Sequence, residues 1–332
     1  MKPAWLSILV VILLAASVLA FQQSLPKEMT YEEAAHLFDY DAKAPLAFQE
    51  KSVEEVRGVK VHDVSYASPK GGSVPAYLVI PSGKGPFPAI IFVHWGQGDR
   101  SEFLAESLML ARAGAESLLI EGVFNRPNGQ GDDFAVPEKE RAGYIQLVTD
   151  IRRGVDLLQS RPEVDAKRIA YVGHSYGATW AGVLAAVEKR IKAHVVMGGL
   201  PTLADFSAGT FIGEWVHKNY NQQQIEKYIA TLAPIEPERF AGHAAPSTLF
   251  FQFAHQDRYI TPKLAKEYWD AASQPKIQKW YYCSHEFNDP AALMDRDEFL
   301  RQQLRLKPVA PQILERLGMR ATPARVVRRG AE

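Results

Sequence analysis

The fold of this chain is decided by the stretch Arg168-Ile169-Ala170-Tyr171-Val172-Gly173-His174-Ser175-Tyr176-Gly177. Its first half is a strand pattern of apolar residues, and residues 173–177 match the pattern Gly-x-Ser-x-Gly. An alanine-rich segment that favours a helix follows without a spacer and extends to residue 187. Average glycine usage produces such a pentapeptide by chance in roughly one chain in ten of this length. The strand before it and the helix after it therefore carry the argument.

This strand–turn–helix setting places Ser175 in a very tight turn. We expect a strained backbone at Ser175, and we expect Gly173 and Gly177 to form the elbow because they lack side chains that would clash there. The hydroxyl is then presented at a helix N-terminus, where the dipole favours developing negative charge. The setting predicts a nucleophilic serine, and the alternative is a serine that only caps the helix.

Strand and helix patterns alternate on both sides of the elbow. Continuous apolar segments are typical of strands buried on both faces of a parallel sheet. Two earlier alternating segments, joined by residues 70–73, predict an antiparallel hairpin. The predicted strands are 59–66, 74–80, 89–93, 117–120, 168–172, 194–197, 247–253 and 279–283, and the predicted helices include 103–113, 144–158 and 175–187. We therefore expect an α/β fold with a mostly parallel, twisted sheet of about eight strands and helices on both faces.

Catalytic groups in such a sheet gather beyond the carboxyl ends of the strands. A serine hydroxyl needs a base there, and His285 follows the last predicted strand. Asp257 lies four residues past strand 247–253 and completes the chain order Ser, Asp, His. The rival acid is Asp205, which follows the preceding strand. Other histidines near strand ends are His94, His174 and His255.

Two backbone amides are expected to hold the oxyanion that forms when a serine attacks a carbonyl. One is the amide of Tyr176, which follows the nucleophile. The other comes from the loop at residues 94–98, where we choose Gly96, with Trp95 and Gln97 as alternatives. Four aromatic residues are candidates for the wall of an acyl pocket, although aromatic residues are more often core: Trp95, Phe124, Tyr176 and Trp215.

These residues resemble the dienelactone hydrolase-like branch of the α/β-hydrolases, together with related acetyl esterases, over most of residues 58–304. Residues 150–158, 161–165 and 168–169 resemble that branch's approach to the elbow, and residues 282–287 resemble its histidine loop. The resemblance implies an α/β-hydrolase fold and a triad of Ser175, Asp257 and His285. Dienelactone hydrolases carry cysteine as nucleophile, whereas this chain has serine, as related acetyl esterases do.

The organisation predicted for the 332 residues has one catalytic domain, residues 57–306, with a lid insertion at 200–246. Residues 21–56 form a lead-in segment, and residues 307–332 form a C-terminal tail with the composition of a flexible segment. An apolar run ending at Ala20 predicts a signal peptide over residues 1–20 and export to the periplasm or the extracellular space. The alternative is a retained N-terminal membrane anchor.

Composition narrows the function further. Lys+Arg and Asp+Glu both number 38, which does not suggest a nucleic-acid partner. The single cysteine, Cys283, excludes an intramolecular disulfide and a cysteine-based metal site. We therefore expect a serine hydrolase that cleaves a small carboxylic ester through an acyl-enzyme, with no cofactor and no metal. The alternatives are a small peptidase with the same triad and a non-catalytic binding protein on this fold.

Overall fold

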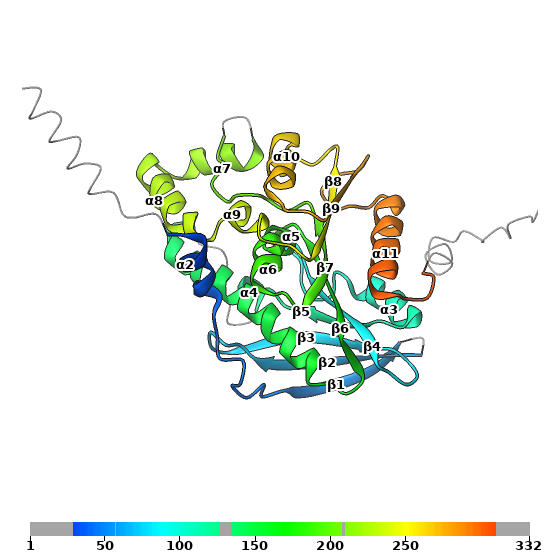
Figure 1. Cartoon of the computed structure of the whole chain (residues 1–332). Coiled ribbons are helices and arrows are strands. Elements are labelled where there is room, and N and C mark those ends of the chain that lie inside the picture. The colour runs from blue at the N-terminus through cyan, green and yellow to red at the C-terminus, as the bar shows by residue number, and fades with distance from the viewer. Residues whose placement is uncertain (1–28, 57, 127–133, 208–209, 310–332) are drawn as a thin grey trace, which may run out of the picture.

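The computed structural model describes residues 29–56, 58–126, 134–207 and 210–309. Within these residues nine strands form one mixed sheet in the order β1-β2-β3-β5-β4-β6-β7-β8-β9 (Figure 1). The strands are β1 Gln49–Val56, β2 Val59–Ala67, β3 Ser73–Ile80, β4 Phe87–Val93, β5 Glu116–Ile120, β6 Val164–His174, β7 Ile191–Met197, β8 Thr248–Ala254 and β9 Lys276–Tyr281. The predicted signal peptide lies outside the described residues.

Parallel pairing joins β5, β4, β6, β7, β8 and β9, and antiparallel pairing joins β1, β2, β3 and β5. The expected mostly parallel sheet and the expected hairpin between β2 and β3 are confirmed. The nine strands of the described residues agree with the expected number of about eight. The strand without a sequence signal is β1, at the end of the lead-in segment. Seven of the eight residues of β1 are exposed, and it forms a charged edge of the kind that discourages further strand pairing.

Helices cover both faces of this sheet. Figure 1 shows α4 and α6 on one face and α3 and α11 on the other. The helices are α2 Tyr31–Ala35, α3 Leu104–Ala113, α4 Pro137–Gln159, α5 Tyr176–Thr179, α6 Ala181–Val187, α7 Phe211–Asn219, α8 Gln222–Leu232, α9 Pro237–Ala241, α10 Pro262–Ala271 and α11 Pro290–Leu304. Short 3-10 turns occur at η1 His36–Phe38, η2 Val123–Asn125 and η3 Ala233–Ile235. The predicted insertion at 200–246 thus contains α7, α8 and α9.

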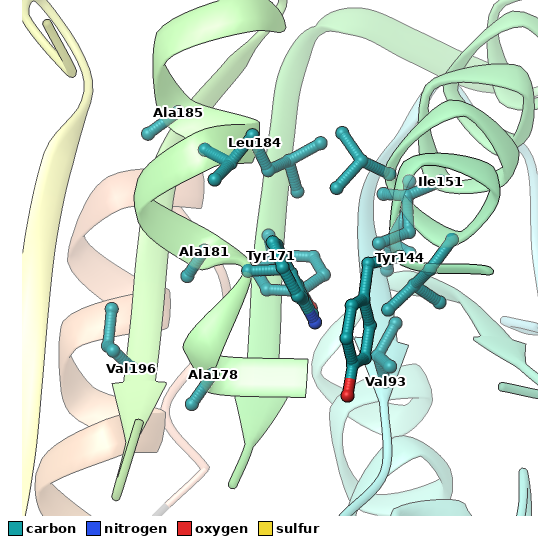
Figure 2. Close-up of a cluster of buried hydrophobic side chains, with 14 of the residues drawn as sticks. Val93, Tyr144, Ile151, Tyr171, Ala178, Ala181, Leu184, Ala185 and Val196 are labelled. Atoms are coloured by element: carbon teal, nitrogen blue, oxygen red, sulfur yellow. The ribbon is translucent and has the colours of Figure 1, made fainter. Parts of the chain in front are cut away.

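In the described part of the chain two hydrophobic clusters form the core, one on each face of the sheet, because successive residues of a strand point in opposite directions. In β4, Ile91 and Val93 join the cluster beneath α4 and α6, whereas Ile90 and Phe92 join the cluster beneath α3 and α11. Figure 2 shows part of the first cluster, in which side chains of α4, α6 and β6 meet. The buried Tyr171 of this cluster donates a hydrogen bond to the carbonyl of Gly177 at 2.7 Å. The core therefore holds the turn after β6 in place.

The helix predicted over residues 175–187 is divided at Trp180 into α5 and α6. The hydroxyl of Tyr268, from α10, accepts a hydrogen bond from the Gly182 amide at 2.9 Å and donates to the Thr179 carbonyl at 2.8 Å. A side chain inserted into a helix's own hydrogen-bond ladder interrupts the helix. The division is thus a tertiary effect that local sequence does not encode.

Among the described residues, no helix has the length and apolarity needed to cross a bilayer.

Candidate active site

The turn between β6 and α5 holds Ser175 at φ 49° and ψ −102°. A positive φ is uncommon for a residue with a side chain and costs energy unless the surroundings enforce it. At Ser175 the surroundings enforce the positive φ through close packing of the backbone. A Cβ on Gly173 would lie 2.5 Å from the Gly177 carbonyl carbon, and one on Gly177 would lie 2.4 Å from the carbonyl oxygen of Val93. Only glycine fits at either position.

His285 and Asp257 lie together at the same edge of the sheet. His285 Nδ1 is 2.7 Å from Asp257 Oδ2, and both side chains are at most 4% exposed. The other carboxylate oxygen, Oδ1, accepts hydrogen bonds from the amides of Tyr259 at 2.8 Å and Ile260 at 2.9 Å. These amides fix the carboxylate, and the carboxylate in turn fixes the imidazole ring. The contact with Asp257 occupies Nδ1, which leaves Nε2 as the nitrogen suited to accept a proton.

A pocket of about 230 Å³ contains Ser175 and His285 together. The loop after β4 forms one wall and residues of the 200–246 segment form another. Its lining residues are Trp95, Gly96, Gln97, Ser175, Leu200, Ile212, Tyr259, Ile260 and His285. The structure thus brings the predicted nucleophile, the predicted base and the predicted oxyanion loop to one cavity. Of the four aromatic residues considered for the acyl pocket, Trp95 belongs to this lining, whereas Phe124, Tyr176 and Trp215 are not among its described residues.

The rival residues have other partners. Asp205 accepts from the Ser207 amide at 3.0 Å and forms an ion pair of 3.1 Å with Lys263. The ring of His255 lies 4.4 Å from the ring of Tyr282, which is exposed, and packs against Trp280 as well. Among the histidines considered from the sequence, His285 both lines the Ser175 pocket and contacts a carboxylate, that of Asp257.

The loop after β4 is fastened by His94. One ring nitrogen of His94 lies 2.6 Å from the Trp95 carbonyl oxygen, and the other lies 2.9 Å from the Gly122 amide and 3.2 Å from Glu121 Oε1. The ring is buried among these partners. His94 therefore fixes the conformation of the loop after β4, and this loop forms one wall of the pocket.

Glu102 affects the choice of an oxyanion donor in this loop. Its Oε2 accepts the Trp95 amide at 2.8 Å, so that amide is already engaged. Of the three amides considered for the second oxyanion donor, those of Gly96 and Gln97 remain as candidates. A Cβ on Gly96 would lie 3.9 Å from Tyr176 Cβ, which places the Gly96 backbone beside the residue that carries the other expected donor.

Glu102 and His174 together bridge two loops of the site. His174 Nδ1 lies 2.6 Å from Glu102 Oε1, and His174 Nε2 lies 2.8 Å from the carbonyl oxygen of His285. With the Glu102–Trp95 bond, this chain of contacts connects the loop after β4 to the loop that carries His285. Sequence reasoning missed Glu102, which is 72 residues from His174 and belongs to no local motif.

Strongly shifted pKa values occur outside the pocket. Burial raises the pKa of Glu236 to about 7, and its Oε2 accepts the Leu203 amide at 2.8 Å, which anchors the segment that begins at Leu200. Burial lowers the pKa of His194, in β7, to about 3. Among the described residues, no group of three or more His, Cys, Asp or Glu side chains is suited to hold a metal ion.

The mixed sheet, the two covering layers of helices and the turn after β6 define an α/β-hydrolase. The chain belongs to the acetyl xylan esterase (AXE1) family, whose model matches residues 32–241. The matched range includes Ser175 and ends before Asp257 and His285. Family membership makes the protein a hydrolase that acts on ester bonds.

Solved structures of related esterases share the fold. The acetyl xylan esterase from Paenibacillus sp. R4 superposes with a TM-score of 0.69 at 20% identity, covering 85% of this chain and 98% of its own. Acetyl xylan esterase 1 from Thermoanaerobacterium sp. JW/SL YS485 gives a TM-score of 0.69 at 16% identity, covering 82% of this chain and 93% of its own.

A curated relative shares more sequence over a shorter region. The 2,6-dihydropseudooxynicotine hydrolase of Paenarthrobacter nicotinovorans is 31% identical over 179 residues, which are 54% of this chain. The match spans only 44% of that relative's length.

Proposed function

We propose that this protein is a serine esterase that cleaves small carboxylic esters through an acyl-enzyme. In this proposal Ser175 attacks the ester carbonyl, His285 accepts its proton, and Asp257 holds the imidazole. The amides of Tyr176 and Gly96 stabilise the oxyanion. The observation that carries the proposal is the 2.7 Å contact between His285 Nδ1 and Asp257 Oδ2. His285 lines the same pocket as Ser175, whose backbone has a positive φ.

The proposed reaction has two halves. In the first, the new bond joins Ser175 Oγ to the acyl carbon, and the ester C–O bond breaks as His285 returns the proton to the leaving alcohol. In the second, His285 takes a proton from water, the hydroxide attacks the acyl carbon, and the proton passes to Ser175 Oγ as the acid leaves. Asp257 remains ionised throughout and keeps the imidazolium in place.

The pocket favours a short acyl group. At about 230 Å³ it is smaller than the roughly 300–1,000 Å³ typical of sites for drug-sized ligands. The names of the family and of two structural neighbours refer to acetyl xylan. We propose an acetyl or similarly short acyl ester as the substrate of this chain.

The test compares 4-nitrophenyl esters of increasing acyl length with an acetyl 4-nitroanilide in wild type, Ser175→Ala and Ser160→Ala. Ser160 is exposed at the end of α4 and serves as the matched control. We expect acetate to be the best ester, and Ser175→Ala to lower kcat by up to about a millionfold. Near-full activity of purified Ser175→Ala would overturn the proposal. Faster cleavage of the anilide would favour the peptidase alternative, and inactivity toward both would favour a binding protein.

We also propose that residues 1–20 direct export and are removed. N-terminal sequencing of the mature protein from fractionated cells tests this directly. A first residue at Phe21 supports the proposal, whereas an intact first segment in the membrane fraction supports the anchor instead.

A further inference from the structure

A second cavity of about 420 Å³ adjoins the pocket of about 230 Å³ that holds Ser175. Leu200 and Ile212 line both spaces, so these two side chains stand between them, and we call the pair the partition. We call the second space the aromatic cavity because six of its lining residues are aromatic. They are Phe134, Tyr144, Phe206, Trp215, Tyr220 and Tyr228.

The partition is fixed close to the nucleophile. The Leu200 amide donates to Thr179 Oγ1 at 3.0 Å, and the Thr179 hydroxyl in turn donates to the Ser175 carbonyl at 2.9 Å. Ile212 lies in the first turn of α7, and the side chain of its capping residue, Thr210, accepts a backbone amide of that turn at 3.0 Å. Such a cap stabilises the first turn of a helix. Both residues of the partition are half-buried, and they therefore form a defined wall of the Ser175 pocket.

The aromatic cavity and His285 lie on opposite sides of Ser175. The cavity is lined by residues of α4, α7 and α8, and none of its described lining residues comes from the loops after β8 and β9, which carry Asp257 and His285. Figure 1 shows α4 and α8 on one side of α5, the helix that follows Ser175, and β8 and β9 on the other. The ring of Tyr144, in the cavity lining, has its centroid 6.2 Å from that of Tyr176. The cavity therefore extends from the Ser175 pocket in the direction away from His285.

These two directions correspond to the two halves of an ester. In the proposed reaction His285 returns a proton to the leaving alcohol, so the alcohol oxygen must lie beside His285. The acyl group extends from the carbonyl carbon in the other direction, toward Leu200 and Ile212. An acyl chain too long for the Ser175 pocket therefore meets the partition before it reaches the aromatic cavity.

The aromatic cavity is suited to an apolar chain. Most of its lining residues are aromatic or aliphatic, and its two acids are engaged with other residues. The Tyr228 hydroxyl donates to Glu140 at 2.8 Å, and Lys263 forms an ion pair of 3.1 Å with Asp205. Burial of methylene groups against such a surface stabilises a bound chain. Access past the partition therefore decides whether an acyl chain can use this cavity.

We propose that Leu200 and Ile212 set the acyl-length limit of this enzyme by closing the acyl pocket off from the aromatic cavity. The inference rests on the proposed function at Ser175. When either side chain is shortened, the aromatic cavity becomes an extension of the acyl pocket and takes a hexanoyl chain.

The test measures kcat/KM for 4-nitrophenyl acetate and 4-nitrophenyl hexanoate in wild type, Leu200→Ala and Ile212→Ala. The two esters share a leaving group, so the ratio of their kcat/KM values isolates the effect of the acyl chain. We expect the hexanoate-to-acetate ratio to rise about tenfold or more in each variant, which corresponds to about 1.4 kcal/mol and to the burial of about two methylene groups. A ratio that stays at the wild-type value in both variants, with circular dichroism showing that they are folded, would overturn the inference.

Leu203 supplies two controls, because it is half-buried like the partition and lines the aromatic cavity, whereas it is not among the described residues of the Ser175 pocket. Leu203→Ala enlarges the cavity and leaves the partition intact, so it should keep the wild-type ratio. Leu203→Trp combined with Ile212→Ala fills the newly opened space and should cancel most of the gain. A gain that survives Leu203→Trp, or an equal gain in Leu203→Ala, would also overturn the inference.

A binding experiment separates this inference from the proposed function. Calorimetry measures the binding of hexanamide and acetamide to Ser175→Ala, with and without Ile212→Ala. Hexanamide should bind about tenfold more tightly when Ile212→Ala is present, and acetamide should be little affected. That result supports the role of the partition even if the wild type cleaves no ester, in which case only the proposed function fails. Cleavage of 4-nitrophenyl acetate with no change in hexanamide binding or in the ester ratio leaves the proposed function standing and refutes the role of the partition.

Discussion

Replacing Asp257 with asparagine is expected to lower kcat about 10⁴-fold without disturbing the fold. The amides of Tyr259 and Ile260 both donate to Oδ1, so the carbonyl oxygen of asparagine must stay with them. Its NH₂ group then faces His285 Nδ1, which must become an acceptor. The ring hydrogen moves to Nε2, the atom that has to accept the proton of Ser175.

The magnitude follows from this change of tautomer. A triad whose histidine is held in the wrong tautomer loses about 10⁴-fold in kcat, which corresponds to about 5.5 kcal/mol in activation free energy. The geometry here matches that situation because the substitution preserves shape and both backbone hydrogen bonds. We expect KM to change little and the thermal midpoint to stay within a few degrees of the wild type.

Initial rates with 4-nitrophenyl acetate measure the effect, and circular dichroism during heating checks the fold. Asp205→Asn, which alters the rival acid paired with Lys263, is the control and should keep most of the activity. Wild-type-like activity of Asp257→Asn in a folded preparation would refute the reasoning. A large loss in Asp205→Asn alone would assign the orienting role to Asp205.

Three further predictions test the supports of the site. Gly177→Ala should be destabilised by several kcal/mol in urea unfolding, since its Cβ would meet backbone at 2.4 Å, whereas Gly96→Ala, with only a 3.9 Å contact, should unfold like the wild type. Glu102→Gln should lower kcat about tenfold or more in ester assays with little change in KM, because it weakens the link between the two loops. His194→Leu should make stability less sensitive to acid. The pKa of His194 is about 3 in the folded protein and 6.5 when unfolded, so the wild type loses about 2 kcal/mol from this group between pH 7 and pH 5.

Each of these predictions has a result that contradicts it. A Gly177→Ala protein as stable as Gly96→Ala would refute the close approach at the elbow. A Glu102→Gln enzyme with unchanged kcat would show that the bridge does not position the loops. The sign for His194 follows from its lowered pKa, since only the unfolded chain gains a proton as pH falls below 6.5. Equal losses of stability in wild type and His194→Leu between pH 7 and pH 5 would contradict it.

Most of the sheet is predictable from the sequence because its strands are locally encoded. The apolar segment in β4 and the left-handed glycine that ends α3, Gly114 at φ 100°, are signals contained within a few residues. The strand β1 gives no such signal. Half of its eight residues are charged and seven are exposed, and pairing with β2 is what makes it a strand. Edge strands without a buried face lack the alternation on which sequence-based prediction depends.

The same distinction applies to the residues of the site. Those that belong to local sequence patterns can be predicted, whereas those that act through contacts with distant residues cannot. The positions of Ser175, Asp257 and His285 after β6, β8 and β9 are enough to predict three neighbouring loops. The structure places His285 against Asp257 and in one pocket with Ser175. Glu102 could not be found this way. It becomes part of the bridge between two loops only through contacts with residues distant in the sequence, such as His174.

The most direct test identifies the nucleophilic residue by chemical labelling. The purified protein is treated with a fluorophosphonate, digested, and its peptides are mapped by mass spectrometry. We expect one phosphonyl group per chain, attached to Ser175, and no labelling of Ser175→Ala. We also expect much slower labelling of Asp257→Asn, since His285 no longer accepts the proton efficiently. Labelling at another serine, or equal labelling of Ser175→Ala, would contradict the central claim.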